Sequence, residues 1–219
     1  MSFDFIASGY DRLARLVFGN TLTMAWQWCA RRVPPHSRVL VLGGGTGALL
    51  PRVMAAQPQR VLYLEASVKM LRMAQERMGS SADSELLEFR HGTEADLNAD
   101  EVFDVILLPF VLDLYSEHTL SRQLIPRLLR ALTQTGMLLV CDFNQPEGYW
   151  QRLQLWVMIR FFRVVANIEI TQLPNWPTLL QQAEFVEIEH AFLRNGQVRM
   201  GRWHRATPSP TPGILPSVN

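Results

Sequence analysis

The chain has 219 residues, 48% of them hydrophobic, and its formal net charge at pH 7 is +1. These values predict a soluble globular protein with one sizeable core, and they exclude the strongly charged surface that nucleic acid or acidic partners require. The two cysteines are too few for a disulfide framework, and no metal is expected because Cys and His show no metal-ligand spacing. No signal peptide is evident, so we expect a cytoplasmic protein.

Residues 1–33 precede the first strand and are predicted to form an amino-terminal helical cap. Leu13, Leu16 and Val17 recur at helical spacing, and Tyr10 stands at the start of this amphipathic segment. The segment either packs as a surface helix on the sheet that follows or folds over a bound ligand.

A buried strand at residues 39–42 runs directly into a glycine-rich turn. The turn consists of Gly43, Gly44, Gly45, Thr46 and Gly47. Glycine adopts positive φ at low cost and lets a ligand approach the main chain, and the N–H groups of the following helix favour electron-rich ligand atoms. The turn therefore predicts a nucleotide or nucleoside site at the carboxyl end of the first strand of an α/β sheet.

Two ligand classes fit this turn. Gly43, Gly45 and Ala48 satisfy the dinucleotide pattern G-x-G-x-x-A. Alternate glycines at 43, 45 and 47 instead resemble the first motif of class I S-adenosylmethionine-dependent methyltransferases. The second strand, residues 61–65, ends in Glu65, whose carboxylate is suited to bridging a ribose diol in either class.

The segments after Glu65 favour the methyltransferases. Residues 66–71 read Ala-Ser-Val-Lys-Met-Leu, a third strand at 86–90 leads into Gly92-Thr93-Glu94, and a fourth opens with Phe-Asp-Val-Ile at 103–106. A helix, a turn ending at Gly136 and a fifth strand follow. This ordered set resembles that family over roughly residues 3–205.

The resemblance implies an α/β fold with a doubly wound, mostly parallel seven-stranded sheet, a Rossmann-like arrangement. Strand-like runs at 185–193 and 197–203, joined by Arg194-Asn195-Gly196, predict its antiparallel carboxyl-terminal hairpin. Residues 1–205 would form a single domain, and the proline-rich segment 206–219 is expected to be a disordered tail.

The same resemblance implies S-adenosyl-L-methionine as the cofactor. Tyr10 would reach it, because the opening of the chain resembles the ubiquinone and menaquinone-biosynthesis methyltransferases. Most relatives carry an acid at the position of Val41 that orders the glycine loop and the methionine end of the cofactor. Its replacement by valine bears on cofactor affinity, while Glu65 and the glycines keep the implied site. The implied cofactor-binding residues are Tyr10, Gly43, Gly44, Gly45, Thr46, Gly47, Glu65, Ala66, Met70, Gly92, Thr93, Glu94, Leu108 and Pro109.

A helical lid insertion is predicted at residues 145–180. Residues 149–165 are apolar on most faces, but Arg160 and Arg163 interrupt the run, which is too short for a transmembrane segment. Such a helix must be covered. Three interpretations are open: a core helix, a lid over an apolar acceptor, or a docking face for lipid or a second copy of the chain.

Methyl transfer needs positioning above all, and a base only when the acceptor must lose a proton. Asp113 and His118 are the candidate bases, although a structural role suits each of them as well. Leu108-Pro109-Phe110 lacks a polar group that could grip an amino target, which disfavours nucleic acid. The sequence thus predicts methyl transfer from S-adenosylmethionine to a small apolar or aromatic acceptor.

Two alternatives remain. One is an NAD-dependent oxidoreductase, although the only lysine, Lys69, has Glu65 four residues before it and so excludes the Tyr-x-x-x-Lys pair of short-chain dehydrogenases. The other is a binding protein that kept the methyltransferase fold and lost catalysis, which Val41 and the single turn glycine Gly136 favour.

Overall fold

The structure, a computed structural model, describes residues 17–79, 85–145, 148 and 172–206. The proposed cap tyrosine, Tyr10, and the apolar segment 149–165 lie outside these ranges. The roles predicted for them therefore stay predictions, as does that of the tail beyond residue 206.

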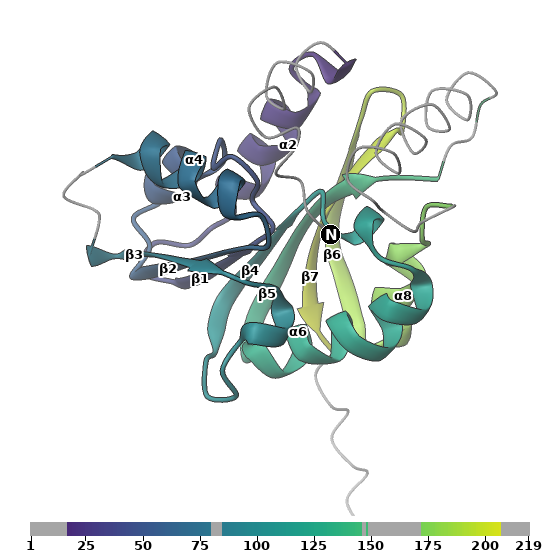
Figure 1. The fold of residues 1–219 in the computed structure, drawn as a ribbon. Coiled ribbons are helices and arrows are strands. Elements are labelled where there is room, and N and C mark those ends of the chain that lie inside the picture. Colours follow the sequence, from purple (N-terminus) through teal and green to yellow (C-terminus); the bar gives the residue numbers. More distant parts are fainter. Residues whose placement is uncertain (1–16, 80–84, 146–147, 149–171, 207–219) are drawn as a thin grey trace, which may run out of the picture.

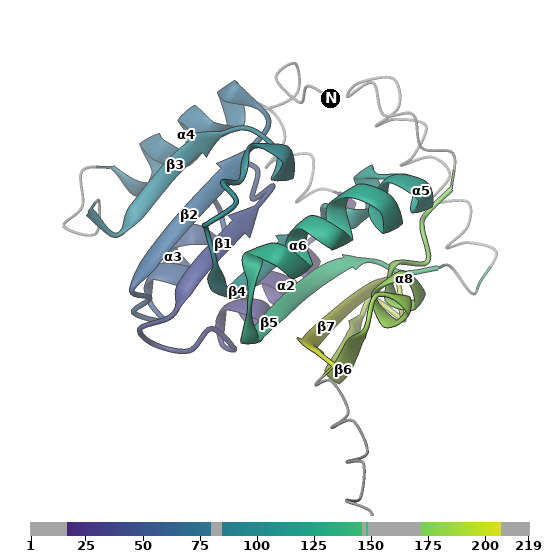
Figure 2. The same ribbon diagram turned by 90° about the horizontal axis from the view of Figure 1, so that it is seen from below.

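A seven-stranded sheet forms the centre of the molecule, with strand order β3-β2-β1-β4-β5-β7-β6 (Figures 1 and 2). The strands β1 to β5 pair in parallel, and β7 runs antiparallel to both of its neighbours. The predicted fold class is confirmed. The strands are β1 Arg38–Leu42, β2 Arg60–Glu65, β3 Leu87–His91, β4 Phe103–Pro109, β5 Leu132–Phe143, β6 Phe185–Leu193 and β7 Val198–Arg205.

The central strands are mostly apolar because helices cover both faces of the sheet. In β1 every residue from Val39 to Leu42 is buried. Side chains of alternating direction enter two separate core clusters, one on each face, with Val39 and Val41 in one and Leu40 and Leu42 in the other.

Helices α2, α3 and α4 cover one face, and α6 and α8 cover the other (Figures 1 and 2). A π-helical segment, Leu120–Leu124, joins α5 to α6. Within the described ranges, every helix is too short or too polar to cross a membrane. The helices are α2 Thr21–Ala30, α3 Leu50–Met54, α4 Val68–Met78, α5 Glu117–Thr119, α6 Ile125–Ala131 and α8 Trp176–Gln182.

Helix α2 is the part of the predicted amino-terminal cap that the structure describes. It packs on β5 and β7, and Ala25 and Cys29 are buried in that contact. Just beyond the helix, Arg32 Nε donates to Glu189 of β6 at 3.0 Å. This part of the segment therefore covers the sheet, as an amphipathic surface helix would.

The carboxyl-terminal hairpin follows the Asn-Gly signal. Arg194, Asn195 and Gly196 all have positive φ, at 53°, 52° and 88°, and they reverse the chain between β6 and β7. Strand β5 differs from expectation, because it already begins at Leu132, within the predicted turn. Leu132 pairs with Phe103, and the ladder shifts register before the next pairs.

Candidate functional site

The carboxyl ends of the parallel strands meet at one edge of the sheet, where β1 lies between β2 and β4. The chain leaves β1 toward α3 and α4 on one face, and it reaches α6 on the other after β4 (Figure 2). Ligands of open α/β sheets bind at such a change of direction. The glycine turn after β1, Glu65 at the end of β2 and Pro109 at the end of β4 all lie here.

Three positions of the turn have a left-handed backbone, which favours glycine. Gly43, Gly45 and Gly47 have φ of 66°, 64° and 76°, a region that costs other residues energy. A Cβ on Gly43 would lie 2.6 Å from Cγ2 of Val111, so that glycine permits a close approach to the chain after β4. At Gly45, among the residues that the structure describes, a Cβ would meet only the sulfur of Met70, at 3.8 Å. The space beside Gly45 is therefore open to a ligand.

Helix α4 packs directly against the turn. A Cβ on Gly47 would lie 2.7 Å from Cβ of Ala74 and 2.9 Å from its Cα. Arg77 of the same helix donates from Nε to the Thr46 carbonyl oxygen at 3.0 Å, and Thr46 itself is buried. Gly47 and Thr46 thus serve the contact between turn and helix.

The Glu65 side chain joins two loops at this edge. Its Oε2 accepts from the Gly45 N–H and its Oε1 from the Ser67 N–H, both at 2.9 Å. Its main-chain oxygen accepts from the Gly92 N–H at 3.0 Å. Burial raises the pKa of the Glu65 carboxyl, and the N–H groups of Ser67 and Gly45 oppose that rise.

The segment after Glu65 is ordered by its own polar groups. Ser67 is the N-cap of α4, and its hydroxyl accepts from the Met70 N–H at 3.1 Å. This bond places Met70 beside the turn. The Ala66 carbonyl oxygen lies 3.0 Å from Nε2 of His91, which ends β3.

The loop after β3 is built around a buried carboxylate. Thr93 caps the short helix Glu94–Asp96, and the Asp96 carboxylate accepts from the Thr93 N–H in return. Glu94 Oε1 pairs with Nη1 of Arg127 at 3.0 Å, and its Oε2 accepts from the Tyr115 hydroxyl at 2.9 Å. Burial and the Glu94 charge raise the pKa of the Tyr115 phenol. Both oxygens of Glu94 therefore already have protein partners.

The end of β4 presents an apolar surface with a strained backbone. Leu108 and Pro109 are buried within the strand. Phe110 follows with φ of 59°, an unusual conformation for an aromatic residue. Its N–H donates to the Cys141 carbonyl at 2.7 Å, and its ring centroid lies 5.2 Å from that of Phe143.

The candidate base Asp113 lies beside a second buried acid, Asp142. Asp142 Oδ2 accepts from the N–H groups of Val111, at 3.0 Å, and Leu112, at 2.7 Å. The Asp113 N–H lies 3.4 Å from Asp142 Oδ2, while the buried Oδ1 of Asp113 has no partner among the described residues. Burial raises the pKa of Asp113 to about 7, and burial with the Asp113 charge raises that of Asp142. The pair therefore retains a proton toward neutral pH.

The other candidate base, His118, has an exposed side chain in α5. Its carbonyl oxygen accepts from the Ser121 hydroxyl at 3.2 Å. The described contacts do not join it to the acid pair, and its role as a base stays a prediction. Over residues 17–79, 85–145, 148 and 172–206, no group of three or more His, Cys, Asp or Glu side chains could hold a metal ion.

Three residues of this edge were not singled out from the sequence. Tyr63 of β2 donates from its hydroxyl to the Gly45 carbonyl oxygen at 2.8 Å. Asp142 accepts a hydrogen bond from the main chain after β4, and Arg127 forms an ion pair with Glu94. For Tyr63 and Asp142, the sequence offered one signal, a polar group within a mostly apolar strand. It offered none for Arg127.

Comparison with known proteins shows similarity to methyltransferases. Residues 39–136 match the family described as a methyltransferase domain. Over 223 residues the chain is 29% identical to a demethylmenaquinone methyltransferase of Clavibacter sepedonicus, covering 91% of this chain and 87% of that one.

Solved structures of low identity share the fold. The mitomycin 7-O-methyltransferase superimposes with a TM-score of 0.66 at 21% identity, covering 94% of this chain and 61% of that one. The chain thus spans about three fifths of that enzyme's length. The N-methyltransferase NodS from Bradyrhizobium japonicum WM9 gives a TM-score of 0.63 at 14% identity, covering 86% and 99% of the two chains.

Proposed function

Since the chain carries a methyltransferase domain of the S-adenosylmethionine-dependent class at residues 39–136, we propose that it methylates a small apolar or aromatic acceptor at the carboxyl edge of the sheet. The observation that carries the proposal is the pairing of an open, side-chain-free position at Gly45 with the buried Glu65 carboxylate beneath it. When bound, S-adenosylmethionine would supply an electrophilic methyl group on sulfur.

The residues at this edge fit the cofactor. Among the described residues, a Cβ at Gly45 would make only an ordinary van der Waals contact with Met70, which leaves the main chain accessible there. Each Glu65 oxygen accepts one N–H bond, and a carboxylate has room for further donors such as ribose hydroxyls. Thr93 and Glu94 would lie on the adenine side, with Gly92 attached to the main chain of Glu65.

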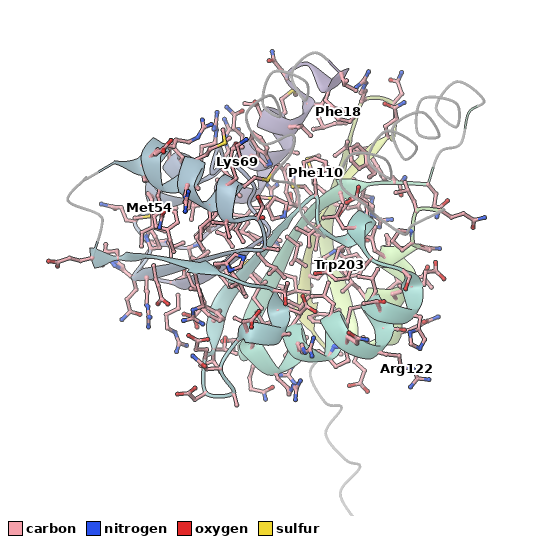
Figure 3. The ribbon with its side chains drawn as sticks, in the orientation of Figure 1. Phe18, Met54, Lys69, Phe110, Arg122 and Trp203 are labelled. Atoms are coloured by element: carbon pink, nitrogen blue, oxygen red, sulfur yellow. The ribbon has the colours of Figure 1, made fainter. Side chains whose placement is uncertain are left out.

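The acceptor class follows from the end of β4. Phe143 lies 5.2 Å from both Phe18 and Phe110, centroid to centroid, so three aromatic rings gather next to the end of that strand. Figure 3 labels Phe18 and Phe110. Leu108 and Pro109 add no polar side chain that could bind an amino group. The Clavibacter relative is named for demethylmenaquinone, a quinone, which agrees with an apolar acceptor.

Asp113 is the base that we propose for acceptors that lose a proton. Its pKa of about 7 is suited to accepting a proton near neutral pH. Asp142 would hold the turn that carries Asp113, because it binds the N–H groups of Val111 and Leu112.

Calorimetric titration with S-adenosylhomocysteine tests the cofactor assignment. We expect binding in the micromolar range and no heat of binding with NADH under the same conditions. Absence of binding by the intact chain would overturn the proposal, and tight binding of NADH alone would support the oxidoreductase.

A methyl-transfer assay tests the acceptor class. Labelled S-adenosylmethionine would be incubated with the chain and a reduced quinone, a simple phenol, a primary amine or an RNA oligonucleotide. We expect label in the quinol or phenol. Label in the amine or the RNA alone would contradict the proposed acceptor, and no label in any of them would favour a chain that binds without catalysis.

A further inference from the structure

Tyr63 lies in the middle of the sheet, directly beneath the glycine turn. Its side chain is fully buried in β2, and its hydroxyl donates to the Gly45 carbonyl oxygen at 2.8 Å. The ring also packs edge-on against Phe89 of β3, with 5.6 Å between centroids. A buried hydroxyl must find a partner, and here the partner belongs to the turn.

Gly44 and Tyr63 are matched to each other. A Cβ on Gly44 would lie 2.4 Å from Cε2 of Tyr63 and 2.6 Å from its hydroxyl oxygen. Any larger residue at position 44 would push the phenol ring out of its place. Position 44 must therefore be glycine, because the Tyr63 ring fills the space that a side chain there would need.

The Gly45 main chain is bound on both sides by β2. Its N–H donates to Glu65 and its carbonyl accepts from Tyr63. The neighbouring residue on β1, Val41, stands beside Tyr63 in the strand register and is apolar. The turn that ends β1 is thus held by the next strand.

We infer that Tyr63 is a positioning residue for cofactor binding, acting through the Gly45 carbonyl. Because the carbonyl and N–H of a trans peptide point in opposite directions, fixing the Gly45 oxygen on Tyr63 fixes the direction of the Thr46 N–H. By holding the turn in place, the same bond also preserves the hydrogen bond from the Gly45 N–H to Glu65. It keeps the space beside Gly45 free for a ligand. This inference rests on the proposed function, since it names the group that orders the cofactor site.

The test removes only the hydroxyl, with Tyr63→Phe. Ser37→Ala is the matched control, because the buried Ser37 hydroxyl also donates to a main-chain carbonyl, that of Pro34 at 2.6 Å, at the opposite end of β1. By titration with S-adenosylhomocysteine, we expect Kd to rise about tenfold in Tyr63→Phe, which corresponds to one hydrogen bond. Kd should not change in Ser37→Ala.

A second measurement does not depend on the ligand. In the ligand-free protein, hydrogen exchange at the Gly45 amide should be faster in Tyr63→Phe than in Ser37→Ala, because only the former loosens the turn. Gly44→Ala, which displaces the ring without removing the hydroxyl, should also raise Kd.

The outcomes separate the two proposals. A wild-type chain that does not bind S-adenosylhomocysteine overturns the proposed function, and with it the role of Tyr63 in cofactor binding. Binding that persists unchanged in Tyr63→Phe, or an equal loss in Tyr63→Phe and Ser37→Ala, overturns the inference alone. A rate of hydrogen exchange at the Gly45 amide that is no faster in Tyr63→Phe than in Ser37→Ala would also overturn the inference alone.

Discussion

The Glu65 carboxylate accepts a hydrogen bond from the Gly45 N–H at 2.9 Å, so the last residue of β2 is attached to the turn that follows β1. The same carboxylate is the group that we propose to bind the ribose hydroxyls. Glu65 therefore contributes both to the order of the turn and to the proposed binding of the sugar.

Glu65→Ala should weaken binding of S-adenosylhomocysteine by about 1–3 kcal/mol, the cost of leaving buried polar groups unpaired. Calorimetric titration measures this as a rise in Kd of roughly 5-fold to 150-fold. Glu76→Ala, an exposed position on α4, is the control and should bind as the wild type does. Unchanged affinity in Glu65→Ala would show that Glu65 does not hold the ribose.

Gly45→Arg should abolish binding, because the arginine side chain would fill the open space beside the turn. Gly79→Arg is the control, since Gly79 ends α4 with a similar φ of 60° and nothing within 4 Å of its Cβ. Both variants pay the backbone strain of a positive φ, about 1–2 kcal/mol. A loss of binding that is equal in the two proteins would contradict a ligand site at Gly45.

Asp113→Asn should change the pH dependence of stability. Burial raises the pKa of Asp113 to about 7 in the folded chain, against about 3.9 when unfolded. The unfolded state releases its proton first, so the free energy of unfolding falls as the pH rises from about 4 to about 7. The variant should lose the part of this decline that Asp113 contributes, which is on the order of 1–4 kcal/mol. Asp142, whose pKa burial also raises, keeps its own part.

Denaturant unfolding at pH 4.5 and pH 7.5 compares the two proteins. Asp100→Asn, at an exposed position, should keep the pH dependence of the wild type. If Asp113→Asn keeps it as well, the buried acid pair does not hold the proton that we assign to it.

Arg127→Ala should lower the free energy of unfolding by about 1–3 kcal/mol, because it leaves the buried Glu94 carboxylate without its guanidinium partner. Arg130→Ala, at an exposed position of the same helix α6, should change it by no more than about 0.5 kcal/mol. Thermal or denaturant unfolding checks both. Equal effects in the two variants would show that the ion pair does not stabilise the loop after β3.

Local sequence patterns predicted most of the fold. Apolar runs marked the strands, and the Asn195-Gly196 pair marked the hairpin, because these signals depend on neighbours in the chain. The alternate glycines and Glu65 marked the edge of the sheet where they now meet. Their order along the chain was sufficient, since parallel strands bring their carboxyl ends to the same edge.

Contacts across strands were less predictable. Asp113 was singled out as a candidate base, and its position beside Asp142 depends on the pairing of β4 with β5, which the sequence did not reveal. Phe110 likewise combines a positive φ with a main-chain bond to Cys141 on the neighbouring strand. Such features depend on the register between paired strands, and the sequence of one strand alone does not determine that register.

By itself, the sequence determined the order of strands and turns along the chain and the position of the glycine-rich turn that we propose to bind a nucleoside, because periodicity and glycine spacing act over a few residues. Only the tertiary structure decided what holds that loop, namely Glu65 and Tyr63 acting on the Gly45 peptide. A hydrogen bond between strands needs both partners in place, and that placement exists only after the sheet has assembled.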